Sequence, residues 1–241
     1  MTSNNQSQNT CLPNNGLPEN FVTNDSWPNC SGPILDQGVC GSCWAFGASV
    51  TLAELRCIAN LSKGYLQLST QDPVSCDRLN LGCNGGILKN VFDYMTRYGL
   101  VSESCFPYIS GALSRIPRCP SSCIRRNEPV IKYKCQPDST VNYGMNIECI
   151  KSWIFTHGPM EVGYIVYEDF MNYESGVYSH TYGENVGGHA VKLIGWGKTS
   201  SGVDYWICKN SWSTKWGMNG YFWIKQGDSG IDKEAYSCIP Q

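Results

Sequence analysis

Apolar residues recur at helical spacing in the first half of the chain. The segment 42–59, SCWAFGASVTLAELRCIA, has this spacing. A second such segment runs from Ile87 to Tyr98, where apolar residues return at i, i+4, i+7 and i+8. Because glycine commonly follows the last turn of a helix, we predict that this helix ends at Gly99. The first half is therefore expected to be helical.

The second half has the alternation of apolar and polar residues that is typical of strands. One more helix is predicted at about 147–156, after which the pattern changes in MEVGYIVY, GHAVKLIGW, VDYWICKNSW and GYFWIKQG. Residues 100–145 carry Gly, Pro and Cys with little periodicity and are expected to be loops. Runs of helix followed by runs of antiparallel strand predict an α+β protein with a cleft where the two halves meet.

Cysteine is the unusual feature of the composition. The chain has 14 cysteines among 241 residues and a formal net charge of -2. This charge gives no reason to expect nucleic acid or an anionic membrane as a partner. So many cysteines favour a disulfide-bonded protein of the secretory or lysosomal route. Zinc is the alternative, but His157, His180 and His189 do not have the spacing of a zinc site, so we expect no metal.

Localisation can only be inferred from indirect features. No stretch approaches the roughly 18–20 apolar residues that span a bilayer, so no membrane span is expected. The first ten residues, MTSNNQSQNT, lack the basic and apolar regions of a signal peptide. Residues 1–16 are therefore predicted to be a mobile end or the remnant of a pro-segment. Four N-x-Ser/Thr sequons agree weakly with secretion, at Asn5, Asn24, Asn29 and Asn60.

One segment, Gln37 to Phe46 (QGVCGSCWAF), delivers a cysteine to the first turn of an apolar helix. Amides and the partial positive charge at a helix N-terminus favour the thiolate of Cys43 and so lower its pKa. A helix end contributes only about 0.3–2 kcal/mol, so the thiolate also needs a cationic partner. We therefore predict that Cys43 is a nucleophile activated by a histidine.

His189 is the histidine whose sequence context suits this task. It stands in GGHAVKLIGWG, at the start of a predicted strand from which its ring could face the cleft. Asn210 follows 21 positions later in KNSW and can accept the second imidazole N–H, while Trp212 covers that bond from water. A thioredoxin-like redox centre of Cys40 and Cys43 is the alternative, but it would leave the His189 and Asn210 motifs unexplained.

Together, QGVCGSCWAF, GCNGG, GGHAV and NSW-x3-WG-x-NGY resemble the papain-like cysteine proteases. LPENF, WPNC, SGVYSHTYGE and GID-x-E are similar to the cathepsin B group of that family, and the resemblance covers about 17–241. It implies a two-domain fold, with a helical left domain, an antiparallel β-barrel-like right domain and the active-site cleft between them. Within the peptidase unit 17–241, we expect a helical, disulfide-rich subdomain at about 36–129, a β-rich one at about 130–225, and a C-terminal tail that returns towards the cleft.

The resemblance also implies roles for single residues. Gln37 would be the side-chain donor of an oxyanion hole, with the backbone N–H of Cys43 as the second donor. His189 would protonate the leaving amine, and no cofactor is implied. Gly85 and Gly86 would offer bare backbone to an extended substrate. The likeness further implies disulfides between Cys30 and Cys57, Cys40 and Cys83, Cys76 and Cys119, and Cys105 and Cys123.

Five cysteines have no expected partner, so at least one of them should stay free unless it bonds another chain: Cys11, Cys135, Cys149, Cys208 and Cys238. For Cys208, two residues before Asn210, we expect a buried, small apolar role. His180 matches a position of the family, yet a surface or packing role is expected for it.

Substrate preference depends on two further features. Asp232, in GID-x-E, matches the position of an acid at the floor of the second substrate pocket, so Asp232 and Trp212 complete the substrate-binding candidates. The segment 105–123 is shorter than the occluding loop of cathepsin B and has no histidine, although Arg115 or Arg118 could supply charge. We therefore expect an endopeptidase that accepts basic or hydrophobic P2 residues, with reduced or absent dipeptide-removing activity.

The expected partners are polypeptide substrates and a pro-segment or a protein inhibitor of the cystatin kind. We expect a monomer made as a zymogen, located outside the cell or in an acidic lysosomal or vacuolar compartment. A catalytically inactive papain-fold protein that binds peptides or inhibitors is the alternative, because this fold can lose its nucleophile.

Overall fold

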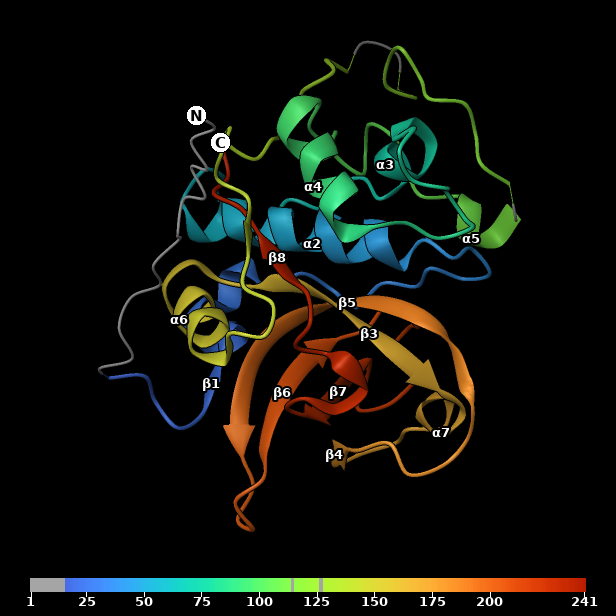
Figure 1. Ribbon diagram of the computed structural model, residues 1–241. Helices are drawn as coiled ribbons and strands as arrows, with labels where there is room; N and C mark the ends of the chain where they lie inside the picture. Colours follow the sequence, from blue (N-terminus) through green and yellow to red (C-terminus); the bar gives the residue numbers. More distant parts are fainter. Residues whose placement is uncertain (1–15, 114, 126–127) are drawn as a thin grey trace, which may run out of the picture.

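The computed structural model describes residues 16–113, 115–125 and 128–241. Helices α2 to α5 form one half of the molecule and most strands form the other, with α2 along the boundary (Figure 1). The elements in chain order are β1 (Phe21–Val22), α1 (Thr23–Ser26), η1 (Pro28–Cys30), α2 (Cys43–Ile58), α3 (Gln71–Cys76), α4 (Leu88–Arg97), α5 (Ser110–Leu113), β2 (Val141–Asn142), α6 (Ile147–His157), β3 (Met160–Tyr167), α7 (Glu168–Met171), β4 (Val177–Tyr178), β5 (Asn185–Lys198), β6 (Asp204–Lys209), β7 (Tyr221–Lys225), η2 (Asp228–Gly230) and β8 (Ala235–Ser237).

Helix α2 is buried over most of its length. A helix that is apolar on nearly every side belongs inside a protein, and α2 packs against α4 on one side and against β3 and β5 on the other. Trp44, Leu52 and Leu55 on α2 are each at most 2% exposed. The helix that begins at Cys43 is thus shared by both halves, which places the first turn of α2 at their junction.

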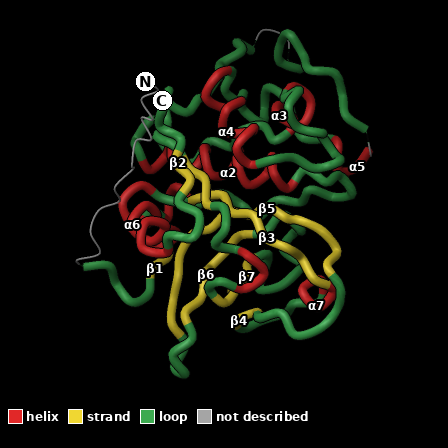
Figure 2. Tube along the Cα trace, viewed as in Figure 1, coloured by secondary structure: helices red, strands yellow, loops and turns green. Residues whose placement is uncertain are grey.

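The sheet is one curled layer with open edges (Figure 2). Its order is β2-β8-β3-β5-β6-β7-β4, with β1 paired to β5. All pairs are antiparallel except β4 with β7. Large aromatic side chains fill the core of this half, among them Phe170, Trp206 and Phe222, each fully buried. The sheet does not close, so the barrel-like half is a strongly curved sheet.

The three predicted helices are present within two residues of their expected ends. The four predicted strand segments correspond to β3, β5, β6 and β7. Periodicity did not reveal the elements of two to four residues, such as α5 inside the segment expected to be loops. The C-terminal tail contributes β8, which pairs with both β2 and β3.

Disulfide bonds join segments that lie far apart in the sequence. The four pairs that the resemblance implied are all bonded: Cys30–Cys57, Cys40–Cys83, Cys76–Cys119 and Cys105–Cys123. A fifth bond, Cys135–Cys238, ties the C-terminus to the end of the helical half.

The remaining cysteines differ in their state. Cys149 is also disulfide-bonded, and Cys11 lies outside the described residues. Among the described cysteines, only Cys43 and Cys208 are free thiols. Cys208 is fully buried in the sheet core, in agreement with the apolar role expected for it. No helix in the described part of the chain is long and apolar enough to cross a membrane.

Candidate active site

Cys43 is the first residue of α2, and its side chain is partly exposed at the junction of the two halves. The cap residue Ser42 is fully buried. Burial raises the pKa of the Cys43 thiol, while hydrogen bonds from the backbone amides of Ala190, Trp44 and Cys43 itself lower it. The Ala190 amide shows that the thiol lies against β5, directly after His189.

His189 is buried on β5, and its Nε2 lies 2.7 Å from Oδ1 of Asn210. The same oxygen accepts the backbone N–H of Ser211 at 2.8 Å, which fixes the orientation of the Asn210 amide. An amide oxygen only accepts, so Nε2 is the protonated nitrogen of the neutral ring, and Nδ1 is left as its acceptor. The Trp212 ring covers this pair, with its centroid 4.7 Å from that of His189.

Burial opposes a charge on the imidazole as well as on the thiol. It lowers the pKa of His189 to about 4, while the hydrogen bond with Asn210 raises it. The cationic histidine that the sequence led us to expect is therefore unfavourable without a counter-charge. Since a thiolate beside an imidazolium offsets both burial costs, we expect Cys43 and His189 to become charged together, by proton transfer from sulfur to Nδ1.

Gln37 is held on three sides. Its Oε1 accepts a hydrogen bond from Ser211 Oγ at 2.6 Å, and its Nε2 donates to the Cys40 carbonyl at 3.0 Å. Its backbone N–H donates to the Ser211 carbonyl at 2.9 Å. These contacts distinguish the two ends of the amide and leave one Nε2–H unused. Ser211 is thus a site residue that sequence analysis missed, although it stands in the NSW motif.

Cys43 and His189 line a cleft of about 580 Å³, together with Gly85 and Gly86. A Cβ on Gly86 would lie 2.5 Å from the Trp44 ring, so only glycine fits there. A second pocket of about 320 Å³ adjoins the other side of His189. Its walls are Val166, Met171, Val186, Gly187, Gly188 and Trp212. An extended peptide can therefore pass across Cys43 with pockets on both sides of the nucleophile.

Comparison with known proteins agrees with this geometry. Residues 17–239 match the family described as papain family cysteine protease. The chain belongs to this family. It is 42% identical over 223 residues to "Cathepsin B-like CP2" of Giardia intestinalis, covering 92% of this chain and 74% of that protein. It is 40% identical over 242 residues to "Cathepsin B" of Dictyostelium discoideum, with 93% and 75% covered.

Solved structures lead to the same group. The structure of "proCathepsin B S9 from Trypanosoma congolense" superposes with a TM-score of 0.87 and 32% sequence identity, covering 94% of this chain and 78% of that one. The proform of the ragweed pollen protease Amb a 11 gives a TM-score of 0.78 and 27% identity. The protein is therefore a cathepsin B-like cysteine peptidase of the papain family, and relatives of known structure are made with a pro-segment.

Asp232 is not brought into the cleft of this papain-family protease. Its Oδ1 accepts a hydrogen bond from the Trp206 indole at 2.5 Å, and it is only 8% exposed. Burial raises its pKa, although that indole and the Gly227 amide lower it. Asp232 was expected at the floor of the second substrate pocket, but the chain turns through η2 just before it. The Trp206 indole then binds the Asp232 carboxylate in the core.

Lys233 and Glu234 line the cleft instead. A Cβ on Gly163, another lining residue, would lie 3.4 Å from Glu234 Oε2, so this carboxylate borders the pocket. Glu234 is the second acid of GID-x-E and could have been found there, but the sequence analysis assigned the pocket to the first acid, Asp232.

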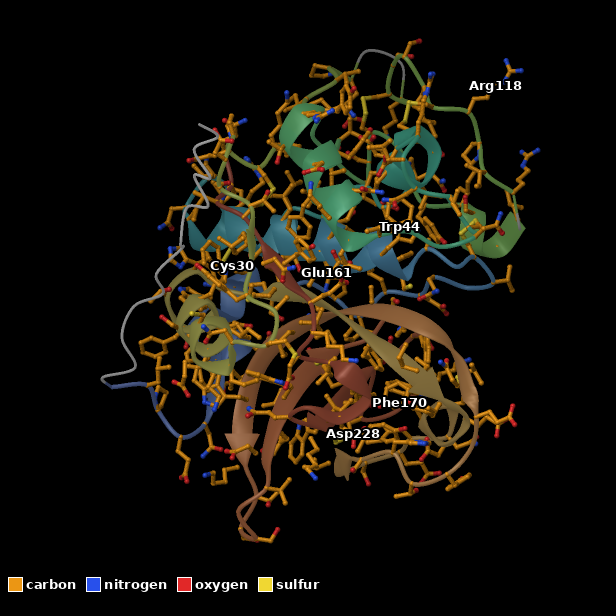
Figure 3. The ribbon with its side chains drawn as sticks, in the orientation of Figure 1. Cys30, Trp44, Arg118, Glu161, Phe170 and Asp228 are labelled. Atoms are coloured by element: carbon orange, nitrogen blue, oxygen red, sulfur yellow. A yellow bond between two sulfur atoms is a disulfide. The ribbon has the colours of Figure 1, made fainter. Side chains whose placement is uncertain are left out.

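Glu161, on β3, is a further acid, at the junction of the two halves (Figure 3), and it interacts electrostatically with Cys43. It is fully buried, and burial raises its pKa well above the ordinary range, with the charges of Cys43 and Glu234 adding to the effect and the Ala48 amide opposing it. Burial therefore favours the uncharged form of the Glu161 carboxyl group.

The remaining candidates lie outside the cleft. Arg118 is exposed at the outer edge of the helical half, and Arg115 is also exposed. The His180 ring stacks on Tyr167 at 3.7 Å and faces Asp169 at 3.2 Å, which is the packing role expected for it. Among the residues that the structure describes, no cluster of histidine, cysteine or acidic side chains could hold a metal.

Proposed function

We propose that this cysteine peptidase cleaves internal peptide bonds through a thioester on Cys43, with His189 as acid and base, Asn210 as the group that orients His189, and Gln37 as an oxyanion donor. The observation that carries this proposal is the 2.7 Å contact between His189 Nε2 and Asn210 Oδ1 beside a free, accessible thiol at a helix N-terminus. Because Nε2 faces Asn210, Nδ1 is the nitrogen left for Cys43, and Cys43 and His189 line the same cleft.

The chemistry follows from this arrangement. The Cys43 thiolate adds to the substrate carbonyl carbon, and the carbonyl electron pair moves to oxygen, where the Cys43 N–H and the unused Gln37 Nε2–H stabilise it. Collapse breaks the C–N bond, and His189 Nδ1–H donates its proton to the leaving amine. A water molecule that transfers a proton to His189 then attacks the thioester, releasing the acid and restoring the thiol.

Titration with a peptidyl epoxide that alkylates thiolates tests this proposal. One equivalent should abolish turnover by the wild-type enzyme, and Cys43→Ser should neither react nor turn over substrate. Turnover that survives in Cys43→Ser would contradict the proposal. A folded wild-type protein without turnover would favour the alternative, an inactive papain-fold protein that binds peptides or inhibitors.

We further propose that the 580 Å³ cleft contains the pocket for the P2 side chain, and that this pocket accepts basic or hydrophobic residues. Its lining combines the apolar Leu88 and Ala190 with the carboxylate of Glu234, and Lys233 lies on the same wall. Apolar walls suit a leucine side chain, whereas Glu234 can pair with arginine or lysine. Lys233 opposes that pairing, so the basic preference should be modest.

The primed side is proposed to be open, as an endopeptidase requires. Segment 105–123 is closed by its own disulfide, and within it Gly111 accepts a hydrogen bond from the Val39 amide at 3.2 Å, beside the turn before Cys43. The segment offers no histidine to bind a substrate C-terminus, so we propose reduced or absent dipeptidyl-carboxypeptidase activity. Mass spectrometry of products from a long peptide should show internal cuts, and a ladder of C-terminal dipeptides would contradict this assignment.

The setting of the enzyme is part of the same proposal. We propose that it is made as a zymogen whose pro-segment occupies the cleft, that a cystatin-like inhibitor can do the same, and that it acts as a monomer outside the cell or in an acidic endomembrane compartment. The disulfides support an oxidising route of synthesis.

A further inference from the structure

The turn Gln37–Ser42 carries the oxyanion donor at one end and meets the nucleophile at the other. A single hydroxyl group joins its two ends. Tyr108 Oη donates to the Gln37 carbonyl at 2.9 Å and lies 2.8 Å from Ser42 Oγ. Because the only hydrogen of the phenol goes to Gln37, Ser42 must donate to Tyr108. The result is a directed chain from Ser42 through Tyr108 to the Gln37 carbonyl, in which each bond strengthens the next.

Tyr108 is itself held in place by its surroundings. Its backbone N–H donates to Glu103 Oε1 at 2.8 Å, and its ring packs edge-on against Phe46 of α2 with centroids 4.8 Å apart. The two following amides, of Ile109 and Ser110, donate to Gln71 Oε1 at 2.9 and 3.0 Å. The hydroxyl group is thus presented to the turn from a fixed support.

We propose that Tyr108 is a positioning residue for the oxyanion hole, and this inference rests on the function proposed above. Ser42 is fully buried, so loss of the phenol hydroxyl leaves its Oγ–H without that acceptor. Without that hydroxyl, the other acceptor near Ser42 Oγ is the Cys40 carbonyl at 3.4 Å, within the same turn. Closing that bond pulls the turn inward and moves Gln37, whose Nε2 also binds the Cys40 carbonyl at 3.0 Å.

Such a movement acts on the transition state more than on substrate binding. Loss of one oxyanion donor costs about 10²–10³-fold in kcat, so a misplaced donor should cost a part of that. For Tyr108→Phe we expect kcat to fall about 10-fold and KM to stay within about twofold. The rate of Cys43 alkylation by iodoacetamide should also stay within about twofold, because alkylation forms no oxyanion.

The test compares Tyr108→Phe with Tyr94→Phe, measuring kcat, KM, alkylation rate and thermal midpoint. Tyr94 is a matched control because it is a buried tyrosine of the same half whose hydroxyl donates to Asp72 at 2.6 Å, away from the turn. Tyr94→Phe should lower the thermal midpoint without changing kcat. Ser42→Ala breaks the same chain from its other end, and the double variant with Tyr108→Phe should be no slower than the slower single variant.

Three results would overturn the inference. These are an unchanged kcat in Tyr108→Phe, an alkylation rate that falls in parallel with kcat, or additive losses in the double variant. If Tyr108→Phe does not fold, Ser42→Ala alone must show the loss of kcat with unchanged alkylation, and its failure to do so would refute the role. A wild-type enzyme without turnover dependent on Cys43 would instead refute the proposed function itself.

Discussion

Replacing Glu54 with glutamine tests how a buried ion cluster aligns the catalytic elements. Glu54 lies on the helix that begins at Cys43 and is 2% exposed. Its Oε1 accepts hydrogen bonds from Lys192 Nζ and from the Gly32 amide, and Lys209 Nζ is 3.6 Å away. Lys192 is on the strand of His189, and Lys209 directly precedes Asn210. One carboxylate therefore links α2 and β5, which carry Cys43 and His189, to β6, which directly precedes Asn210.

The size of the effect follows from burial. Removing one partner of a buried ion pair typically costs about 3–5 kcal/mol, because the other charge remains buried without compensation. We expect Glu54→Gln to lose about this much free energy of unfolding at pH 5.5. Asp93→Asn is the matched control, since its 2.6 Å pair with Lys89 is exposed and should contribute about 0.5 kcal/mol or less.

The same cluster makes the loss depend on pH. Burial lowers the pKa of Lys192 to about 7, although Glu54 raises it, whereas an unfolded lysine has a pKa of about 10.4. From about pH 7 to pH 10 the unfolded chain therefore binds the additional proton, and stability rises with pH in this window. Without Glu54, Lys192 loses its proton at still lower pH, so the loss should be smaller at pH 9 than at pH 5.5.

Urea unfolding of the Cys43→Ser protein, followed by tryptophan fluorescence at pH 5.5, 7 and 9, measures both effects without self-digestion. A loss below about 1 kcal/mol at pH 5.5 would refute the reasoning. So would a loss that grows with pH, because it would mean that Lys192 keeps its charge without Glu54.

Three further predictions concern the cleft. Glu234→Gln should lower cleavage of Arg-Arg relative to Leu-Arg substrates several-fold. Asp232→Asn should leave this ratio unchanged and lower the free energy of unfolding by about 1–3 kcal/mol. The opposite pattern would place Asp232 in the pocket. Because burial lowers the pKa of His189 to about 4, kcat/KM should fall on the acid side with an apparent pKa near 4. An apparent pKa near 6.5 in the pH profile would contradict this. Asn210→Ala should lower kcat about 10–100-fold with little change in KM, and an unaltered kcat would show that His189 is oriented by other contacts.

Local pattern predicted the helices and the catalytic strands well. The apolar run from 42 to 59 forms α2. A helix that is apolar on nearly every side is expected to be buried, whichever elements surround it. His189 and Asn210 meet because β5 and β6 pair in antiparallel register, with Lys192 opposite Lys209. A separation of 21 positions between the two motifs is compatible with such a pairing, since a hairpin brings its two ends together.

Long-range contacts were not predictable in this way. The Cys135–Cys238 bond joins residues 103 positions apart, and no local pattern distinguishes it from other pairings. The side on which Asp232 lies depends on the turn before it and on the Trp206 indole, which comes from another strand. The hydroxyl chain at Tyr108 likewise joins segments 66 and 71 positions apart in sequence.

Strand β8 has a consequence for the order in which the protein becomes active during synthesis. Val162 and Val141, from two earlier strands, both pair with this final strand, and Tyr236 within it stacks on Phe92 of the helical half. The wall of the cleft just before β8 also comes from these last residues. We expect the helical half to be able to compact while the ribosome is still translating, whereas the cleft is completed only after the C-terminus has left the exit tunnel. A nascent chain of this peptidase is thus expected to be a poor protease until β8 has been made.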